Sequence, residues 1–353
     1  MTLLHLLTTT LLTTIAVSTT VEIRATGISS FVIDGLVAAT FTPFDENDVI
    51  DPTQIEKQAA WMNATGVRYA FVSGTTGESV KLTLAERYSQ AEAWLNIAPK
   101  YNIQCIIHVG AESIDDARAM AAHAEKHGAP AFAAMPPVFF KPASTEALAH
   151  TMAAIASAAP TLPFLYYHIP SMTGVAFKDG MFGFVKAMET ANVDNFVGVK
   201  YTGLYTSPGF MDAQRILNYK KGKYQVLCGR DEMMVEALSI GITGFVGSQY
   251  NFVGDLYNMI RSSFAAGKIV QARTLLFTGI EMISVWQDVP SGVDGCKNIF
   301  NGITKNIAVP NVGDARLPSM PISEDALEVL QRNVNSWCST AQEASSTKLC
   351  RSM

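Results

Sequence analysis

The chain has 353 residues and a formal net charge of −5, with 48% hydrophobic and 16% charged residues. This length suits one large domain or two ordinary ones with a sizeable core, and the composition excludes an intrinsically disordered chain. No run of basic residues is concentrated in the sequence, which argues against nucleic acid and against an anionic membrane surface as partners.

The first twenty residues are rich in leucine and threonine, and His5 carries their only titratable side chain. They resemble the apolar core of a secretory signal but lack its basic start, and they are too short and too polar for a clear membrane span. A disordered extension is the alternative. We therefore assign residues 1–30 to a leader or a disordered extension.

The cysteines are few and widely spaced, and no CxxC pair occurs among Cys105, Cys228, Cys296, Cys338 and Cys350. Neither a zinc knuckle nor a disulfide framework is indicated. Cys105 and Cys228 fall in apparent strands, where cysteine most often acts as a small buried apolar residue. We expect a reduced, cytoplasmic protein, with secretion through residues 1–20 as the alternative.

From Gly35 onward, short apolar runs alternate with amphipathic stretches. The runs predict strands at 35–41, 69–73, 104–109, 131–135, 164–168, 196–200, 224–228 and 244–246. The stretches predict helices that include 53–63, 84–98, 114–127, 145–158 and 210–219. Strands that are apolar on both faces and alternate with helices predict an α/β fold, a (β/α)8 TIM barrel over 31–267. A doubly wound open sheet is the alternative, but no glycine-rich dinucleotide fingerprint follows any strand.

Beyond about residue 268 the alternation stops. Helical patterns at 270–286, 294–304 and 324–334 predict a C-terminal helical extension over 268–335. The segment 336–353 is rich in serine and threonine, and we predict a loose tail there.

Two histidines, His123 and His127, are four residues apart in a predicted helix. This spacing suits a chelated metal ion, but the sequence reveals no third ligand. We therefore predict that both histidines lie on a solvated helix face and that the protein has no metal site.

Polar groups follow several strands at the carboxyl ends, where a barrel of this kind carries its chemistry. The motif GTTGE at 74–78 offers amides and hydroxyls that suit a carboxylate, although a plain turn explains it equally well. Tyr167 either passes protons or packs with its hydroxyl bonded. Asp231 and Glu232 either bind sugar hydroxyls or cap the next helix.

Lys200 ends the apolar run at 196–200. A lysine on a buried strand loses hydration, which lowers its pKa and leaves a neutral amine that attacks ketones. Lys200 is therefore a candidate Schiff-base residue, and an ordinary strand-end lysine that reaches solvent is the alternative.

The motifs GTTGE, YYHIPSMTG, GVKYT, CGRDE and GFVGSQYN occur in this order on successive predicted strand ends. Each is weak alone, but the set resembles the N-acetylneuraminate lyase branch of the pyruvate-dependent class I aldolases, a family that includes dihydrodipicolinate synthase. The resemblance runs from about Gly35 into the C-terminal helices. It implies a homotetramer that takes small-molecule substrates.

The resemblance also implies a role for each matching residue. Lys200 would form the Schiff base, and Tyr167 would be the proton shuttle. The substrate carboxylate would be held by Thr75, Thr76 and the amide of Gly77. The hydroxylated tail of a sugar acid would contact Thr202, Gly229, Asp231, Glu232 and Ser248.

Two departures bear on the substrate. The stretch after the fifth strand, 171–174, lacks the arginine with which dihydrodipicolinate synthases usually grip a second carboxylate. The loop after the fourth strand carries Phe139 where many members have a tyrosine that reaches a neighbouring subunit, and animal-type lyases tend to have phenylalanine there. Arg230 beside the acids is unusual, and we expect a salt bridge or a surface position for it.

The function implied is reversible cleavage of sialic acid to N-acetylmannosamine and pyruvate, with no metal or organic cofactor because the lysine supplies the electron sink. An aldolase for another 2-keto sugar acid and a catalytically silent ligand-binding homologue are the alternatives.

Overall fold

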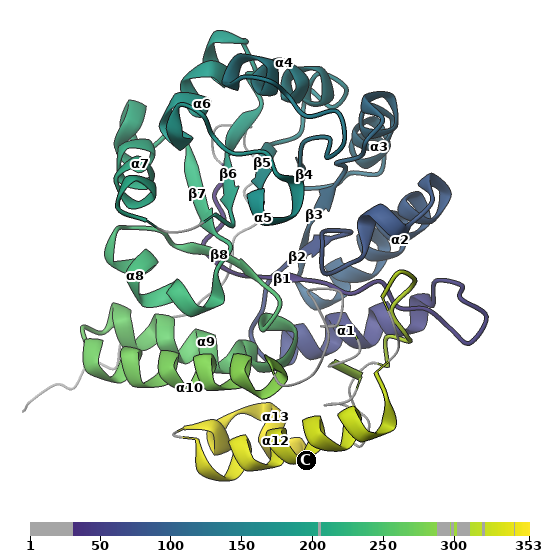
Figure 1. Ribbon diagram of the computed structural model, residues 1–353, viewed down its shortest axis with the longest axis vertical. Coiled ribbons are helices and arrows are strands. Elements are labelled where there is room, and N and C mark those ends of the chain that lie inside the picture. The colour runs from purple at the N-terminus through teal and green to yellow at the C-terminus, as the bar shows by residue number, and fades with distance from the viewer. Residues whose placement is uncertain are drawn as a thin grey trace, which may run out of the picture.

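The computed structural model describes residues 31–203, 206–287, 297, 300–301, 311–319, 322–341 and 343–353. Its eight strands are parallel and close into a barrel in sequence order, each strand beside its chain neighbours and the last beside the first (Figure 1). They are β1 Gly35–Ala39, β2 Tyr69–Val72, β3 Gln104–His108, β4 Ala131–Ala134, β5 Phe164–His168, β6 Phe196–Tyr201, β7 Gln225–Cys228 and β8 Gly244–Gly247. The predicted TIM barrel is confirmed.

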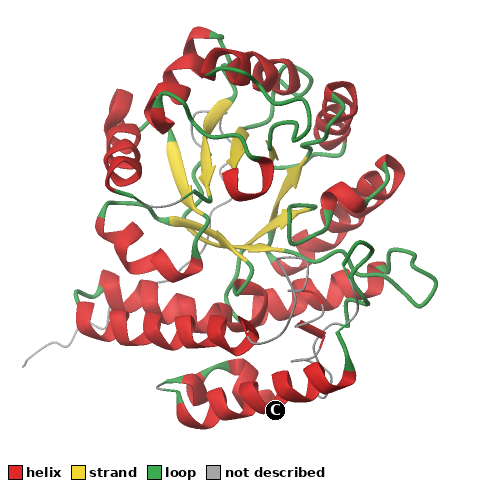
Figure 2. Ribbon diagram, in the orientation of Figure 1, coloured by secondary structure: helices red, strands yellow, loops and turns green. Residues whose placement is uncertain are grey.

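Helices surround the strands, as Figure 2 shows in red around the yellow barrel. The longer ones are α1 Pro52–Ala64, α2 Leu84–Ile97, α3 Ile114–Lys126, α4 Thr145–Ala156, α6 Gly180–Thr190, α7 Ser207–Asn218 and α9 Tyr250–Ala265. Two short ones are α5 Pro170–Thr173 and α8 Met234–Ser239. Their starts follow local sequence: Thr83 and Glu86 form a capping box at α2, and Ser113 caps α3 by accepting from the amide of Asp116.

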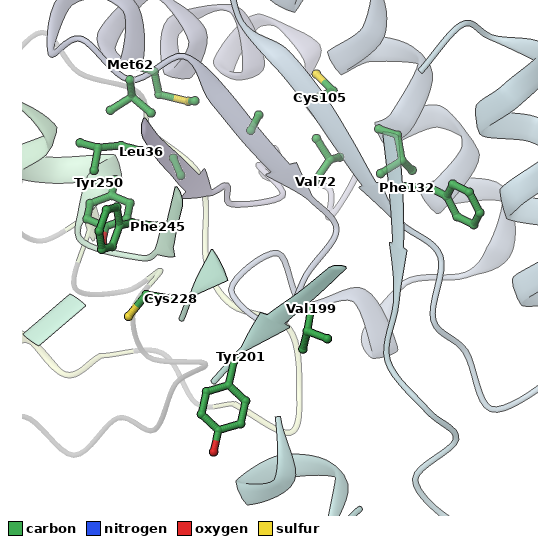
Figure 3. Packing of buried hydrophobic residues seen from close by; sticks show 14 of the residues in the cluster. Leu36, Met62, Val72, Cys105, Phe132, Val199, Tyr201, Cys228, Phe245 and Tyr250 are labelled. Atoms are coloured by element: carbon green, nitrogen blue, oxygen red, sulfur yellow. The ribbon is translucent and has the colours of Figure 1, made fainter. Parts of the chain in front are cut away.

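The buried apolar residues form two layers. An inner layer inside the barrel includes Phe71, Leu165 and Tyr167, while a larger outer layer lies between strands and helices. Figure 3 shows Val199 and Tyr201, both of the outer layer, leaving β6 on the same side. Because side chains alternate along a strand, Lys200 between them points to the barrel interior.

A bulge in β6 sets this direction. The register with β5 shifts between Phe164, opposite Phe196, and Leu165, opposite Gly198, so Val197 is passed over. Val197 belongs to the inner layer and Val199 to the outer one, although residues two positions apart on a strand normally share a face. The extra residue therefore resets the alternation and turns Lys200 inward.

Beyond the barrel, α10 Ile269–Gln287 packs against α9, and α12 Glu324–Thr340 packs against α10. The prediction of a loose tail from Ser336 is wrong for the described residues. There α12 continues to Thr340, α13 Lys348–Ser352 follows, and the Leu349 side chain is buried. The predicted helix at 294–304 lies mostly outside the described residues.

A disulfide joins Cys338 to Cys350 and closes the tail against the end of α12. The expectation that the chain has no disulfide is therefore wrong. The sequence does not reveal the bond because the pairing depends on how α13 folds back, which wide cysteine spacing does not show. Cys105 and Cys228 are buried in strands, as predicted.

Within the described part of the chain, every helix is too short or too polar to traverse a lipid bilayer.

Candidate active site

The centre of the candidate site is the Lys200 side chain inside the carboxyl end of the barrel. Its Nζ lies 3.6 Å from the centroid of the Tyr167 ring and 4.2 Å from that of Phe71. Lys200 and Tyr167 are register partners on β6 and β5, so the sheet itself sets their contact. Lys200 is only 4% exposed. The alternative of a lysine that reaches bulk solvent does not fit this position.

Burial makes Lys200 a weak base. Loss of hydration lowers its pKa from 10.5 to about 7, against an opposing effect of the Asp231 charge. The aromatic faces of Tyr167 and Phe71 also favour the ammonium form. Desolvation wins, so a substantial fraction of the amine is neutral and nucleophilic near neutral pH.

The Tyr167 hydroxyl is fixed by the loop that follows β2. It lies 3.1 Å from the Thr75 hydroxyl. Burial raises the Tyr167 pKa to about 12, so the phenol keeps its proton at neutral pH and is able to donate it. Tyr167 thus has an amine at its ring face and a hydroxyl partner at its tip.

The same loop carries Thr76 and Gly77, which directly follow Thr75 in the sequence. The Thr76 hydroxyl lies 2.9 Å from that of Ser248, which connects the loops after β2 and β8. The Gly77 carbonyl accepts from the Thr42 hydroxyl at 2.7 Å. A Cβ at Gly77 would lie 2.9 Å from the Thr40 carbonyl oxygen, so glycine permits this close packing.

Asp231 is the carboxylate whose charge raises the pKa of Lys200. It accepts from the Gln249 amide at 3.1 Å, and burial raises its pKa to about 6. A Cβ at Gly247 would lie 1.5 Å from its Oδ1, so only glycine leaves room for this carboxylate. The buried Tyr250 hydroxyl also interacts with this carboxylate and opposes the effect of burial on its pKa. A carboxylate accepts several donors, so it could still bind a hydroxyl-bearing ligand.

Two further predicted residues, Thr202 and Gly229, lie directly after β6 and β7. A Cβ at Gly229 would lie 2.1 Å from the Thr202 Oγ1, so the glycine accommodates the threonine. The buried Thr202 hydroxyl interacts with Tyr167 and, like Thr75, opposes the effect of burial on the Tyr167 pKa. A hydroxyl both donates and accepts, so Thr202 could also bind a ligand.

Glu232 differs from its neighbour Asp231. Its carboxylate lies 3.6 Å from the Arg230 guanidinium, and both side chains are about one-third exposed. The expected salt bridge of Arg230 is confirmed. Glu232 therefore sits at the rim of the site, not in its floor.

Two inner residues complete the site, and the sequence alone gave little sign of them. Phe71 lies under the Lys200 amine, but nothing distinguishes it from other apolar strand residues. His108 packs edge-on against Tyr167 at 5.7 Å between centroids, and its Nδ1 lies 2.8 Å from the Ser73 carbonyl oxygen. Burial holds the pKa of His108 well below its usual range, so the ring is neutral.

His168, next to Tyr167 on β5, points to the outer face. Its ring stacks on Phe177 at 3.8 Å and is parallel to Tyr201 at 5.4 Å between centroids. Burial lowers its pKa to about 3, which fits a neutral packing residue.

Glu78, the last residue of the GTTGE motif, is a buried anchor outside the reacting centre. Its carboxylate pairs with Lys297 at 3.0 Å and Lys81 at 3.2 Å, and it accepts from the Arg316 amide at 2.9 Å. Glu78 thereby ties the loop after β2 to the chain beyond the barrel.

The loop after β4 presents Phe139 and Phe140 to solvent, 78% and 81% exposed. The Glu112 carboxylate accepts from the amides of Val138, Phe139 and Phe140 and so fixes the loop. In this chain Phe139 makes no contact with the barrel interior.

Comparison with known proteins agrees with this geometry. Residues 32–336 match the Dihydrodipicolinate synthetase family. The chain is 35% identical to N-acetylneuraminate lyase A of Xenopus laevis over 288 residues, covering 81% of this chain and 90% of the relative. It is 33% identical to N-acetylneuraminate lyase of Danio rerio over 309 residues, covering 86% and 96%.

A solved structure agrees as well. The N-acetylneuraminate lyase (sialic acid aldolase) from Aliivibrio salmonicida superposes with a TM-score of 0.78 at 32% identity, covering 86% of this chain and 97% of that one. Fold, motif order and sequence similarity over most of both chains point the same way. The chain belongs to the dihydrodipicolinate synthetase family.

Proposed function

We propose that the protein is a Schiff-base aldolase that reversibly cleaves N-acetylneuraminate to N-acetylmannosamine and pyruvate. The observation that carries this proposal is the buried Lys200 amine, 3.6 Å above the Tyr167 ring, with a pKa lowered to about 7. The relatives named N-acetylneuraminate lyase support the choice of substrate.

In the proposed reaction, the neutral Lys200 amine attacks the keto carbon of the open-chain sugar acid. Loss of water from the carbinolamine gives a protonated imine, which is an electron sink. The substrate carboxylate would lie in the loop at Thr75, Thr76 and Gly77. This places the new carbon–nitrogen bond beside the Tyr167 hydroxyl, which Thr75 already holds.

Carbon–carbon cleavage needs a proton to leave the hydroxyl on the fourth carbon. Tyr167 would accept that proton and pass its own to the substrate carboxylate, because its high pKa disfavours a lasting phenolate. The bond between the third and fourth carbons breaks, its electron pair forms the enamine, and the aldehyde of N-acetylmannosamine departs. Return of the proton to the enamine carbon and addition of water then release pyruvate and restore the Lys200 amine.

The polar rim would bind the hydroxylated tail of the substrate. Asp231 and Thr202 offer buried oxygens that could accept further hydrogen bonds, and Ser248 and Glu232 lie on the adjoining loops. Gly229 and Gly247 leave space for the Thr202 and Asp231 side chains. Carboxylates suit sugar hydroxyls because each accepts several donors. The mechanism draws its electron sink from Lys200 and requires no metal or organic cofactor.

A homotetramer and a cytoplasmic location are parts of the proposal that rest on the family resemblance and on sequence composition. The Cys338–Cys350 disulfide favours an oxidising compartment instead, which agrees with the alternative of secretion through residues 1–20. Sedimentation of the purified chain tests the tetramer, and fractionation of the source cell tests the location.

The deciding experiment measures pyruvate release from N-acetylneuraminate by the parent chain and by Lys200→Ala. The variant should lose several orders of magnitude in rate because the covalent route disappears. Lys186→Ala is the matched control, since that lysine lies on α6 over the Phe182 ring, outside the barrel interior.

Unchanged turnover by Lys200→Ala would refute the mechanism. If the parent itself releases no pyruvate, pyruvate with borohydride followed by mass measurement separates the alternatives. A stable adduct would indicate an aldolase for another sugar acid, and no adduct would indicate a silent binding homologue.

A further inference from the structure

A second group of metal-ligating side chains lies outside the barrel, between α2 and α3. His123 is in the last turn of α3 and His127 ends that helix, while Glu92 lies in the second half of the adjacent α2. The two helices pack side by side (Figure 1). The third ligand that the sequence does not reveal is thus supplied by a neighbouring helix.

The nitrogen and oxygen atoms of this cluster already converge. Glu92 Oε1 lies 2.8 Å from His123 Nε2 and 3.8 Å from His127 Nε2, and all three ligand atoms lie within 4.8 Å of one another. Tetrahedral zinc with bonds of about 2.1 Å holds its ligand atoms about 3.4 Å apart. To bind one ion, the two stacked rings have to turn so that both Nε2 lone pairs point to the same place as the Glu92 oxygen.

Packing aligns the two imidazole rings. They stack on each other with centroids 4.2 Å apart, and the Tyr88 ring stacks on the other side of His123 at 4.3 Å. Tyr88 is one helical turn before Glu92 on α2, so the same helix orients His123 and supplies the carboxylate. A pair of histidines four residues apart on one helix face is a geometry used for zinc.

The charges around the cluster suit a divalent cation. Glu92 supplies a carboxylate oxygen 2.8 Å from His123 Nε2. Lys126 is the opposing cation. Glu125 faces away and accepts from the Thr161 amide and hydroxyl. The cluster therefore combines two imidazoles with one carboxylate and leaves a fourth position for water.

We propose that Glu92, His123 and His127 form a Zn2+ site that clamps α2 to α3. Because helices run back from the carboxyl to the amino ends of the strands, and α3 leads directly into β4, the site lies at the opposite end of the barrel from Lys200. Its role is to stabilise the fold, and it takes no part in the aldol reaction. Zinc binding would replace the hydrogen bond between His123 Nε2 and Glu92, and the proton of the His123 ring would then be held on Nδ1.

The test is calorimetric titration of zinc chloride into the chelator-treated full chain, with the bound metal counted by elemental analysis. The parent should bind one zinc per chain and show a higher Tm in its presence. His127→Ala and Glu92→Gln should each weaken zinc affinity about 100-fold, since each removes one of three ligands. Glutamine keeps the size and hydrogen bonding of Glu92, so this variant is expected to fold.

The matched control is His150→Ala, which removes an exposed histidine from α4 and should bind zinc as the parent does. Pyruvate release should be equal in all four proteins, which shows that each is folded. Less than one zinc per chain in the parent would overturn the proposal. Equal zinc affinity in the parent, His127→Ala and Glu92→Gln would also overturn it.

Discussion

Lys200 experiences two environments that act on its amine in opposite directions. Burial favours the neutral form, while the Asp231 charge and two aromatic faces favour the ammonium. The net result is a pKa of about 7 in place of 10.5. An amine poised this close to neutrality is both available as a nucleophile and readily protonated as an imine.

This pKa predicts the pH dependence of imine formation. Below about pH 7 the amine is protonated and unreactive, so trapping of pyruvate by borohydride should rise as the pH increases through about 7 and then level off. The initial rate of adduct formation, followed by mass spectrometry at a series of pH values, measures the midpoint. A midpoint near the ordinary lysine value would contradict the effect of burial.

Asp231→Asn is the control for this measurement. The carboxylate raises the Lys200 pKa, so its neutralisation should move the midpoint to lower pH while leaving an adduct with pyruvate. A shift to higher pH would mean that Asp231 does not act on Lys200 through its charge.

Chemical type made several site residues predictable from the sequence. A lysine, a tyrosine and a threonine at strand ends, namely Lys200, Tyr167 and Thr75, have functional groups that stand out, and the structure brings them together. Phe71 was not singled out with them, because an apolar ring serves packing in most proteins. Its contribution depends on contacts across the barrel that no local pattern contains.

At the scale of the element, the bulge in β6 decides which way Lys200 points. Strict alternation from the inward-facing Val197 would turn Val199 inward and Lys200 outward. Gly198 allows the irregularity, because a Cβ there would lie 2.1 Å from the Gln225 carbonyl oxygen. The sequence predicts the strand, but the direction of its lysine depends on a register shift between strands.

Gly198→Ala should therefore disturb both stability and chemistry. We expect a loss of about 2 kcal/mol or more in the free energy of unfolding, because the added methyl group meets backbone on β7. The protein that remains folded should also form less pyruvate adduct, since Lys200 is displaced. Urea unfolding and borohydride trapping measure the two effects.

Val199→Ala on the same strand is the matched control. It removes buried apolar surface from the outer layer and should destabilise the fold by about 2 kcal/mol without altering the alternation. Equal adduct formation by the folded forms of both variants would show that the bulge does not position Lys200.

At the scale of the whole molecule, all eight strands and the barrel they form could be predicted, because strands apolar on both faces give a strong and repeated signal. The tail could not. Its serine and threonine content suggests a loose segment, whereas Leu349 is buried and Cys350 bonds to Cys338. Local composition carries no information on what a segment meets after the chain folds back.

The Glu78–Lys297 pair connects the loop after β2 with the chain beyond the barrel, and both side chains are 1% exposed. Lys297→Met should reduce the free energy of unfolding by about 2 kcal/mol, because Glu78 would stay buried with Lys81 as its remaining ionic partner. Urea unfolding measures this loss. Pyruvate should also bind more weakly, because the loop that carries Thr75 and Thr76 loses an anchor.

Lys100→Met provides the comparison, since Lys100 pairs with Glu56 at 3.6 Å with both side chains largely in solvent. That variant should change stability by no more than about 0.5 kcal/mol. If both variants lost the same free energy of unfolding, the buried Glu78–Lys297 pair would contribute no more to stability than an exposed ion pair.

The same pair restricts how this chain can be recombined with its relatives. A chimera that keeps this barrel but takes its C-terminal helices from a protein with a neutral residue at the place of Lys297 would leave the buried Glu78 with Lys81 as its remaining ionic partner. We therefore expect a chimera joined at the end of the barrel to keep its stability only when Glu78 and Lys297 come from the same parent protein. The barrel and its C-terminal extension, although separate along the chain, should therefore be exchanged between relatives as one unit.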